Sequence, residues 1–138
     1  MSQLAGNARK LGRKDDALRW YEQAFDRSEG PATRLQWGAQ YVSALVELAP
    51  ADEARVERAV TRMIDEAAAD KGAFDGRSAR SLSRVGRQLS QWNRDGRHSA
   101  VVERLRTRLE PVCSKLDGGD AARAACQGTF KAPGKTSA

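Results

Sequence analysis

The sequence predicts an all-α domain, in which three helix pairs stack as an α-solenoid and a short helix caps the end. Ala (23) and Leu (11) make up a quarter of the 138 residues, whereas Val, Ile and Thr together contribute 14. This balance favours helices over a sandwich or a barrel. Turn residues divide the chain into pairs of roughly 35 residues, a period typical of solenoids. A plain six-helix bundle is the alternative.

The first predicted pair is a helix, a tight turn and a second helix. Gly12 is expected to end the first helix, whose apolar residues recur at helical spacing. Asp15 and Asp16 lie at the start of the second helix, where the helix dipole favours acidic side chains. Gly30-Pro31 ends it. The two apolar faces consist of Leu4, Ala5, Ala8 and Leu11, and of Ala17, Trp20, Tyr21, Ala24 and Phe25.

The second predicted pair lies on either side of Pro50. Its first helix is expected from about Pro31 to Ala49, and its second opens with the acidic residues Asp52 and Glu53. Both have an apolar face at helical spacing. The expected buried residues are Leu35, Gly38, Tyr41, Val42, Leu45 and Leu48 in the first helix, and Val56, Val60, Met63, Ile64 and Ala67 in the second.

The third predicted pair follows a loop over residues 70–76 and has its turn at Asp95-Gly96. Pro111 is expected to end or kink its second helix. The apolar residues are Leu82, Val85, Leu89 and Trp92 in the first helix, and Val101, Val102, Leu105 and Leu109 in the second.

The end of the chain predicts a cap and a tail. Gly118-Gly119 breaks the chain, Asp120 is suited to cap a short helix over 121–126, and Gly128 ends that helix. The last residues are small, polar and basic, so we expect them to be disordered. The helical repeat domain is therefore expected over residues 1–127 and the tail over 128–138.

The segment from Leu4 to Phe25, LAGNARKLGRKDDALRWYEQAF, resembles a tetratricopeptide repeat. The matching residues are Leu4 and Ala5 on the first helix, Gly12 at the turn, and Ala17, Tyr21 and Ala24 on the second helix. In that family, small residues let the paired helices approach closely. The later pairs match this pattern poorly, although Gly38 and Tyr41 fall where a glycine and an aromatic residue are expected.

A second resemblance runs from about Leu4 to Cys126. The strings WYEQAFDRSEGPATRLQWGAQYVSALVELAPAD and AFDGRSARSLSRVGRQLSQWN are similar to the helical C-terminal region of exported bacterial thioredoxin-fold proteins. Those proteins have a catalytic CxxC in the domain before this region, and no position here matches it. The resemblance implies an excised accessory domain of a thiol-disulfide interchange protein, found in the periplasm or otherwise exported. The position of Met1, almost inside the first predicted repeat helix, also leads us to expect an excised domain.

The two cysteines, Cys113 and Cys126, lie before and after the Gly118-Gly119 turn. Taken by themselves they are either a bonded pair or two small apolar residues in a reducing cytosol. The resemblance to exported proteins favours a structural disulfide. Such a bond would contribute about 3 kcal/mol through the entropy of the unfolded loop. A redox-active pair is disfavoured, because only Lys115 and Arg123 lie near enough in sequence to lower a thiol pKa.

Five arginines form the candidate binding surface. They recur at helical spacing on the predicted helix before Asp95, roughly opposite its apolar face. Such a stripe suits an acidic protein surface or phosphates. A solvated helix face is the simpler interpretation, and the sequence alone favours it. The residues are Arg77, Arg80, Arg84, Arg87 and Arg94.

The net charge of +6 permits several anionic partners but selects none. Nucleic acid is disfavoured, because no aromatic residues alternate with these arginines. Most aromatic residues are expected in the core, and Trp20 or Trp37 is expected to stay partly exposed. His98 is expected at the surface.

The chain holds a single histidine and none of the common catalytic, metal-binding or phosphate-binding motifs. It has no membrane-spanning apolar run and no signal peptide. The sequence therefore predicts a non-catalytic protein-interaction domain without cofactor or metal. Its partner would be another protein or the parent's own thioredoxin-like domain. The alternative is a basic helical nucleic-acid-binding domain.

Overall fold

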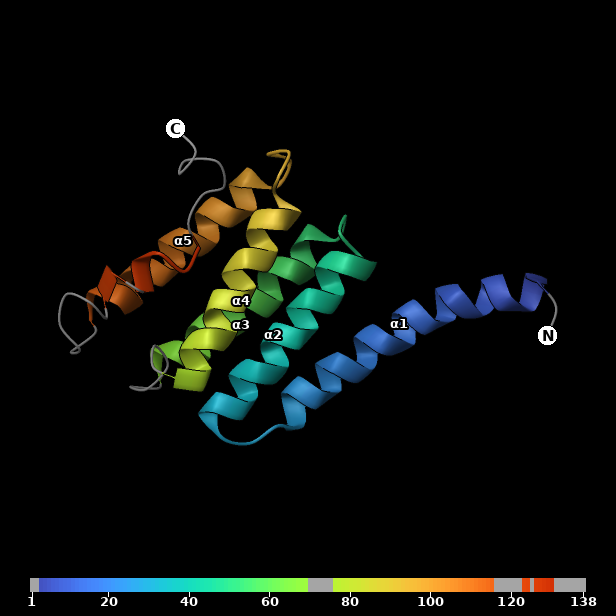
Figure 1. Ribbon diagram of the computed structural model, residues 1–138, viewed down its shortest axis with the longest axis horizontal. Coiled ribbons are helices and arrows are strands. Elements are labelled where there is room, and N and C mark those ends of the chain that lie inside the picture. The colour runs from blue at the N-terminus through green and yellow to red at the C-terminus, as the bar shows by residue number, and fades with distance from the viewer. Residues whose placement is uncertain (1–2, 70–75, 116–122, 125, 131–138) are drawn as a thin grey trace.

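The structure, a computed structural model, describes residues 3–69, 76–115, 123–124 and 126–130, with side chains for all of these except 3–12 and 76–77. This part of the chain contains five α-helices and no strand, which confirms the all-α prediction (Figure 1). The helices are α1 (Gln3–Arg27), α2 (Pro31–Leu48), α3 (Glu53–Ala68), α4 (Gly76–Trp92) and α5 (Ser99–Ser114).

The central helix is α2, which packs against α1, α3 and α4, while α3 also packs against α5 (Figure 1). Arg34 and Glu47 are its charged residues. This composition suits a helix that is covered on several sides, because a buried charge without a partner is costly. Its buried residues are Leu35, Gly38, Ala39, Tyr41, Val42, Ala44 and Leu45.

Arg34 closes the corner between the first three helices. Its Nη1 donates hydrogen bonds to the carbonyl oxygens of Phe25 (3.1 Å) and Ser28 (3.0 Å), near the end of α1. Its Nη2 lies 2.6 Å from Oε1 of Glu66 on α3. The last carbonyl groups of a helix have no partner within the helix, so an arginine from the next helix stabilises this end.

Gly38 allows the same three helices to approach closely. A Cβ atom at Gly38 would lie 2.9 Å from Cγ of Met63 on α3 and 3.2 Å from Cζ of Phe25 on α1. Carbon atoms pack at about 3.5–4.0 Å, so a larger residue would force these side chains to move. The predicted burial of Gly38 is confirmed, and its cause is this contact.

The predicted turn at Gly12 is wrong, because α1 is one continuous helix from Gln3 to Arg27. The helix therefore has no turn at Gly12, where the resemblance to a tetratricopeptide repeat requires one. The first half of α1 extends beyond the other helices (Figure 1). Trp20 is 56% exposed, as expected for Trp20 or Trp37, and Leu18 and Phe25 are the buried large side chains of the second half.

The second and third predicted pairs are confirmed as helices. Asp52 caps α3, since its side chain accepts a hydrogen bond from the backbone N–H of Arg55. Gly96 has a positive φ of 79° in the turn between α4 and α5. Pro111 does not end α5, which continues to Ser114. In these two pairs, every residue expected on an apolar face is buried except Leu48, which is half-buried.

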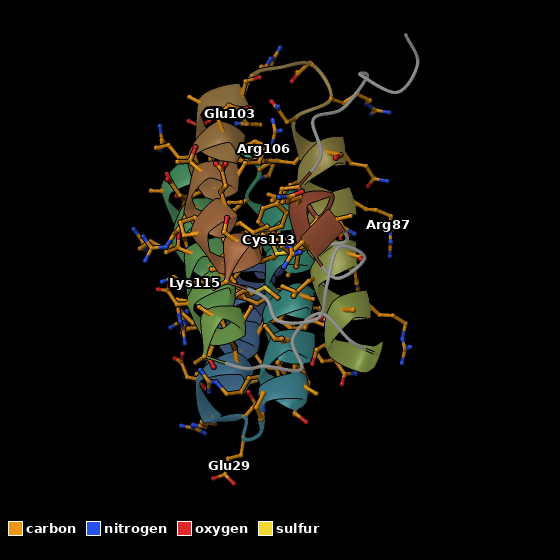
Figure 2. The ribbon with its side chains drawn as sticks, turned by 90° about the vertical axis from the view of Figure 1, so that its left-hand side faces the viewer. Glu29, Arg87, Glu103, Arg106, Cys113 and Lys115 are labelled. Carbon is orange, nitrogen blue, oxygen red and sulfur yellow. A yellow bond between two sulfur atoms is a disulfide. The ribbon has the colours of Figure 1, made fainter. Side chains whose placement is uncertain are left out.

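A disulfide joins Cys113 of α5 to Cys126 in the C-terminal segment, which confirms the predicted bond (Figure 2). Residues 123, 124, 126 and 127 are helical, and Phe130 is buried (2% exposed). Phe130 lies three residues beyond the domain boundary predicted at residue 127. Asp120, residues 121–122 and 131–138, and most of the predicted 70–76 loop lie outside the described residues.

The continuous α1 predicts the effect of replacing Gly12. Alanine at this position should raise the helix content, because alanine is favoured over glycine within a helix by about 1 kcal/mol. Far-UV circular dichroism at 222 nm of Gly12→Ala and of the parent protein measures this change. If Gly12 were a turn residue with positive φ, alanine would lower the helix content and the thermal stability instead.

The disulfide predicts no free thiol in the native, non-reduced protein. Cys113→Ser/Cys126→Ser should lower the free energy of unfolding by about 3 kcal/mol, because the bond limits the unfolded loop. The C-terminal segment should loosen while the helices before Pro111 persist. Thiol labelling, denaturant unfolding and far-UV circular dichroism check the three statements. Two labelled thiols in an air-oxidised native sample would contradict the first.

Candidate functional site: the arginine face of α4

The C-terminal end of α4 is fixed by Trp92. Its indole Nε1 donates a hydrogen bond of 2.8 Å to the carbonyl oxygen of Pro50, in the turn between α2 and α3. His98 stacks on the Trp92 ring with centroids 3.7 Å apart, and its Nδ1 donates to Oε2 of Glu53 at 2.7 Å. The expectation of His98 as a surface residue is wrong, since its side chain is 15% exposed. These contacts hold α4 with its apolar face inward.

Four exposed arginines lie on α4 and just after it. Arg80, Arg84 and Arg87 are on the outward face of α4, whereas Arg94, predicted on the same helix, lies in the turn that follows Trp92, where α4 ends. We call these four residues the arginine face. Within the described residues none of them forms an ion pair or a side-chain hydrogen bond, and Figure 2 shows Arg87 pointing away from the helices. The side chain of Arg77, the fifth predicted residue, lies outside the described ones.

The sequence of α4 explains why these arginines lack partners. From Gly76 to Arg94 the chain has five arginines and no carboxylate, so this stretch carries most of the net charge of +6. Its main neighbour is α2, whose single acidic residue is Glu47. The surface of α4 is therefore positive.

The arginines of α5 differ, because α3 supplies them with carboxylates. Arg104 reaches Glu57 through two hydrogen bonds of 2.8 Å, and Arg108 reaches Asp65 at 3.0 Å. The hydrogen bond from Arg104 lowers the pKa of Glu57 below its usual value. Exposed pairs of this kind contribute little stability. They neutralise positive charge on the surface shared by α3 and α5, whereas Arg80, Arg84 and Arg87 of α4 have no carboxylate partner among the described residues.

A groove of about 600 Å³ lies beside the arginine face. One wall belongs to α4 and consists of Ser83, Gly86, Arg87, Ser90 and Gln91. The other wall belongs to the C-terminal segment and consists of Ala124, Gly128 and Thr129. Arg87 is thus a member of both the arginine face and the groove. The groove is not predictable from the sequence, because its second wall reaches α4 only through the fold.

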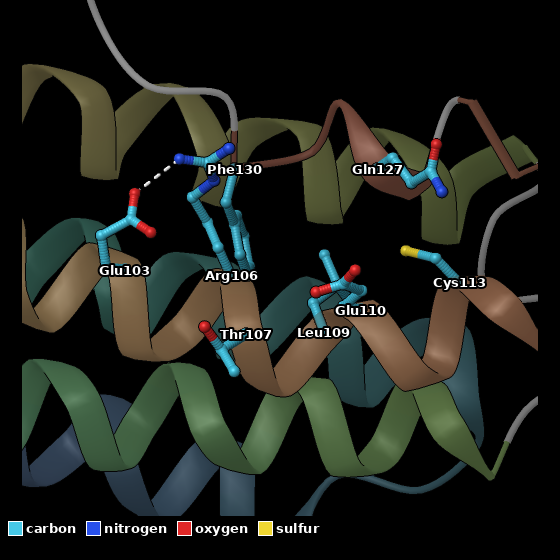
Figure 3. A pocket seen from close by; sticks show the side chains of 8 residues that line it. All are labelled: Glu103, Arg106, Thr107, Leu109, Glu110, Cys113, Gln127 and Phe130. Carbon is cyan, nitrogen blue, oxygen red and sulfur yellow. Dashed lines mark hydrogen bonds and ion pairs between the residues drawn. The ribbon is translucent and has the colours of Figure 1, made fainter.

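A second cavity of about 240 Å³ lies between α5 and the C-terminal segment (Figure 3). Arg106 and Glu103 at its edge form an ion pair with Nη1 and Oε1 2.6 Å apart. Cys113 and Phe130 contribute to its lining. Its arginine already has a carboxylate partner, and the charged group on its lining without an ion pair among the described residues is the carboxylate of Glu110, so this cavity does not suit an anion.

Other kinds of site are absent from the described part of the chain. No group of three or more His, Cys, Asp or Glu side chains lies close enough there to hold a metal ion. None of its helices is both long and apolar enough to cross a membrane. The remaining unusual surface feature is aromatic: Trp20 packs edge-on against Tyr21 and Trp37, with ring centroids 5.2 and 5.4 Å apart.

Comparison of the chain with protein-family models, curated proteins and solved structures finds no match. The resemblance to the helical region of thioredoxin-fold proteins therefore stays a prediction from the sequence.

Exposure of the arginine face predicts that reversing its charge does not harm the fold. Arg80→Glu/Arg84→Glu should shift the melting temperature very little, because surface substitutions without a partner change stability by about 0.5 kcal/mol or less. Arg104→Glu should lower it more, because it places a carboxylate opposite Glu57. Thermal melts of both variants measure this, and a large loss in the double variant would mean that the arginine face is part of the packed structure.

Proposed function

We propose that this chain is a non-catalytic helical domain that binds an acidic surface of a partner protein through the arginine face of α4. One observation carries the proposal: Arg80, Arg84, Arg87 and Arg94 are exposed and without ion pairs among the described residues, whereas most arginines of α3 and α5 have carboxylate partners. The planar guanidinium group binds carboxylates through two parallel hydrogen bonds. A row of such groups along a rigid helix suits a row of carboxylates on a partner.

The aromatic residues favour an acidic protein over a single-stranded nucleic acid. Proteins that bind single strands combine a positive surface with aromatic rings on which bases stack. On the described outward side of α4 no ring accompanies the arginines, since Trp92 is 8% exposed and holds the α2–α3 turn. The exposed ring, Trp20, belongs to α1.

The helix contacts and the disulfide support a further part of this proposal, that the chain is an accessory domain of an exported protein. The α2–α3 hairpin packs against α4 and α5, with α2 on α4 and α3 on α5, as successive pairs of a helical repeat do. A Cys113–Cys126 bond is stable in an oxidising compartment. Both features suit an exported accessory domain, including that of a thioredoxin-like parent.

A titration at two salt concentrations tests the binding proposal. A fluorescently labelled oligoglutamate peptide should bind, and Arg80→Glu/Arg84→Glu should weaken binding about tenfold, or 1.4 kcal/mol. Higher salt should weaken binding further, because exposed charges are screened. Fluorescence anisotropy measures both effects.

The matched control is Arg13→Glu/Arg58→Glu, which makes the same change in net charge at exposed arginines of α1 and α3. It should leave binding close to that of the parent protein. Equal loss in both double variants would mean that total charge governs binding and would contradict the proposal. Tight, steeply salt-dependent binding of a random oligonucleotide, with none of the peptide, would favour the nucleic-acid alternative.

A further inference from the structure

The C-terminal segment (residues 123–124 and 126–130) is held between α5 and α4 by three contacts. The first is the Cys113–Cys126 disulfide to α5. The second is Phe130, which is 2% exposed and lines the cavity next to Leu109. The third is a backbone contact at Gly86, where a Cβ atom would lie 1.8 Å from the carbonyl oxygen of Thr129. Glycine is therefore required for the segment to lie this close to α4.

The groove beside the arginine face exists because of these contacts. Thr129 and Gly128 form the wall opposite α4, and the disulfide is the covalent link that keeps this wall in place. Its volume of about 600 Å³ falls within the range of small-molecule binding pockets, roughly 300–1,000 Å³. Because Arg87 lines the groove, the groove adjoins the proposed protein-binding surface.

The chemistry of the groove is that of an anion site. Ser83, Arg87 and Gln91 supply a hydroxyl, a guanidinium and an amide, and none of these side chains has a hydrogen-bond partner within the described residues. Ser90 and Thr129 already have interaction partners, so we do not count them among the donors that are available to a ligand. No carboxylate is among the described residues that line it. Three donors without partners in the described part of the chain favour a carboxylate, because charge-assisted hydrogen bonds are the stronger kind.

We propose that the groove between α4 and the C-terminal segment is a subsite that receives one carboxylate side chain of the acidic partner, and that the Cys113–Cys126 bond sets its affinity by holding the second wall. This inference rests on the function proposed above. The bond itself takes no part in a reaction with the ligand. An external dithiol would open it by exchange, giving two protein thiols and the cyclic disulfide of the reagent.

Three variants test the subsite with the labelled oligoglutamate peptide in anisotropy titrations. Ser83→Ala/Gln91→Ala should weaken binding several-fold, because it removes two donors and keeps Arg87. Cys113→Ser/Cys126→Ser should weaken binding by a similar factor. The variant that combines all four substitutions should bind no more weakly than the cysteine variant, because the donors act only when the wall is in place. Gln23→Ala/Gln36→Ala, at exposed positions of α1 and α2, is the matched control and should bind like the parent.

The outcomes separate this inference from the proposed function. Far-UV circular dichroism must first show the parent helix content in each variant, and Gly86→Ala, which displaces the segment with the disulfide intact, serves as an independent second variant with the same expected loss. Unchanged affinity in Ser83→Ala/Gln91→Ala, or additive losses in the combined variant, would overturn the subsite. If Arg80→Glu/Arg84→Glu also binds the peptide as tightly as the parent protein does, both the subsite and the proposed function are contradicted.

Discussion

The structure depends on the burial of α2 on three sides. Because α2 contacts α1, α3 and α4, little of its surface is exposed to solvent, where charged side chains are tolerated. Its charged residues are Arg34 and Glu47. Close contact also requires small side chains, and Gly38 meets both Phe25 and Met63. Arg34 is tolerated within this packing because it pairs with Glu66 and donates to the carbonyl groups that end α1. The raised pKa of Arg34, due first to its hydrogen bond with Glu66, reflects the same pairing.

The charge distribution follows from this central packing. The exposed arginines of α4 lie on the face turned away from α2 and have no carboxylate on their own helix, and Figure 2 shows Arg87 pointing away from the helices. The arginines of α5 lie opposite α3, whose Glu57 and Asp65 neutralise them. With five arginines and no carboxylate, residues 76–94 carry the largest local excess of positive charge in the chain.

The sequence predicted α2 to α5 and their buried faces well, because each has a strong apolar period and a turn or cap at its ends. It failed at Gly12, where a glycine in a helical pattern was interpreted as a stop; a single glycine costs about 1 kcal/mol and is tolerated within a long helix. It also missed the burial of Phe130, since an isolated aromatic residue has no periodicity. Helical spacing predicted the exposed face with Arg80, Arg84 and Arg87, but it also placed Arg94 on this helix, which ends at Trp92. The groove was not, because Gly86 and Thr129 meet only through tertiary packing.

The most direct test of the account is amide hydrogen exchange of the oxidised native protein with and without saturating oligoglutamate. Exchange reports local opening along the whole chain, so it locates a binding surface without substitutions. We expect added protection in α4 and in the C-terminal segment, with the exchange of α1 unchanged. Added protection around Trp20 and Trp37, with α4 unaffected, would contradict it by placing the binding surface on the aromatic side of α1 and α2.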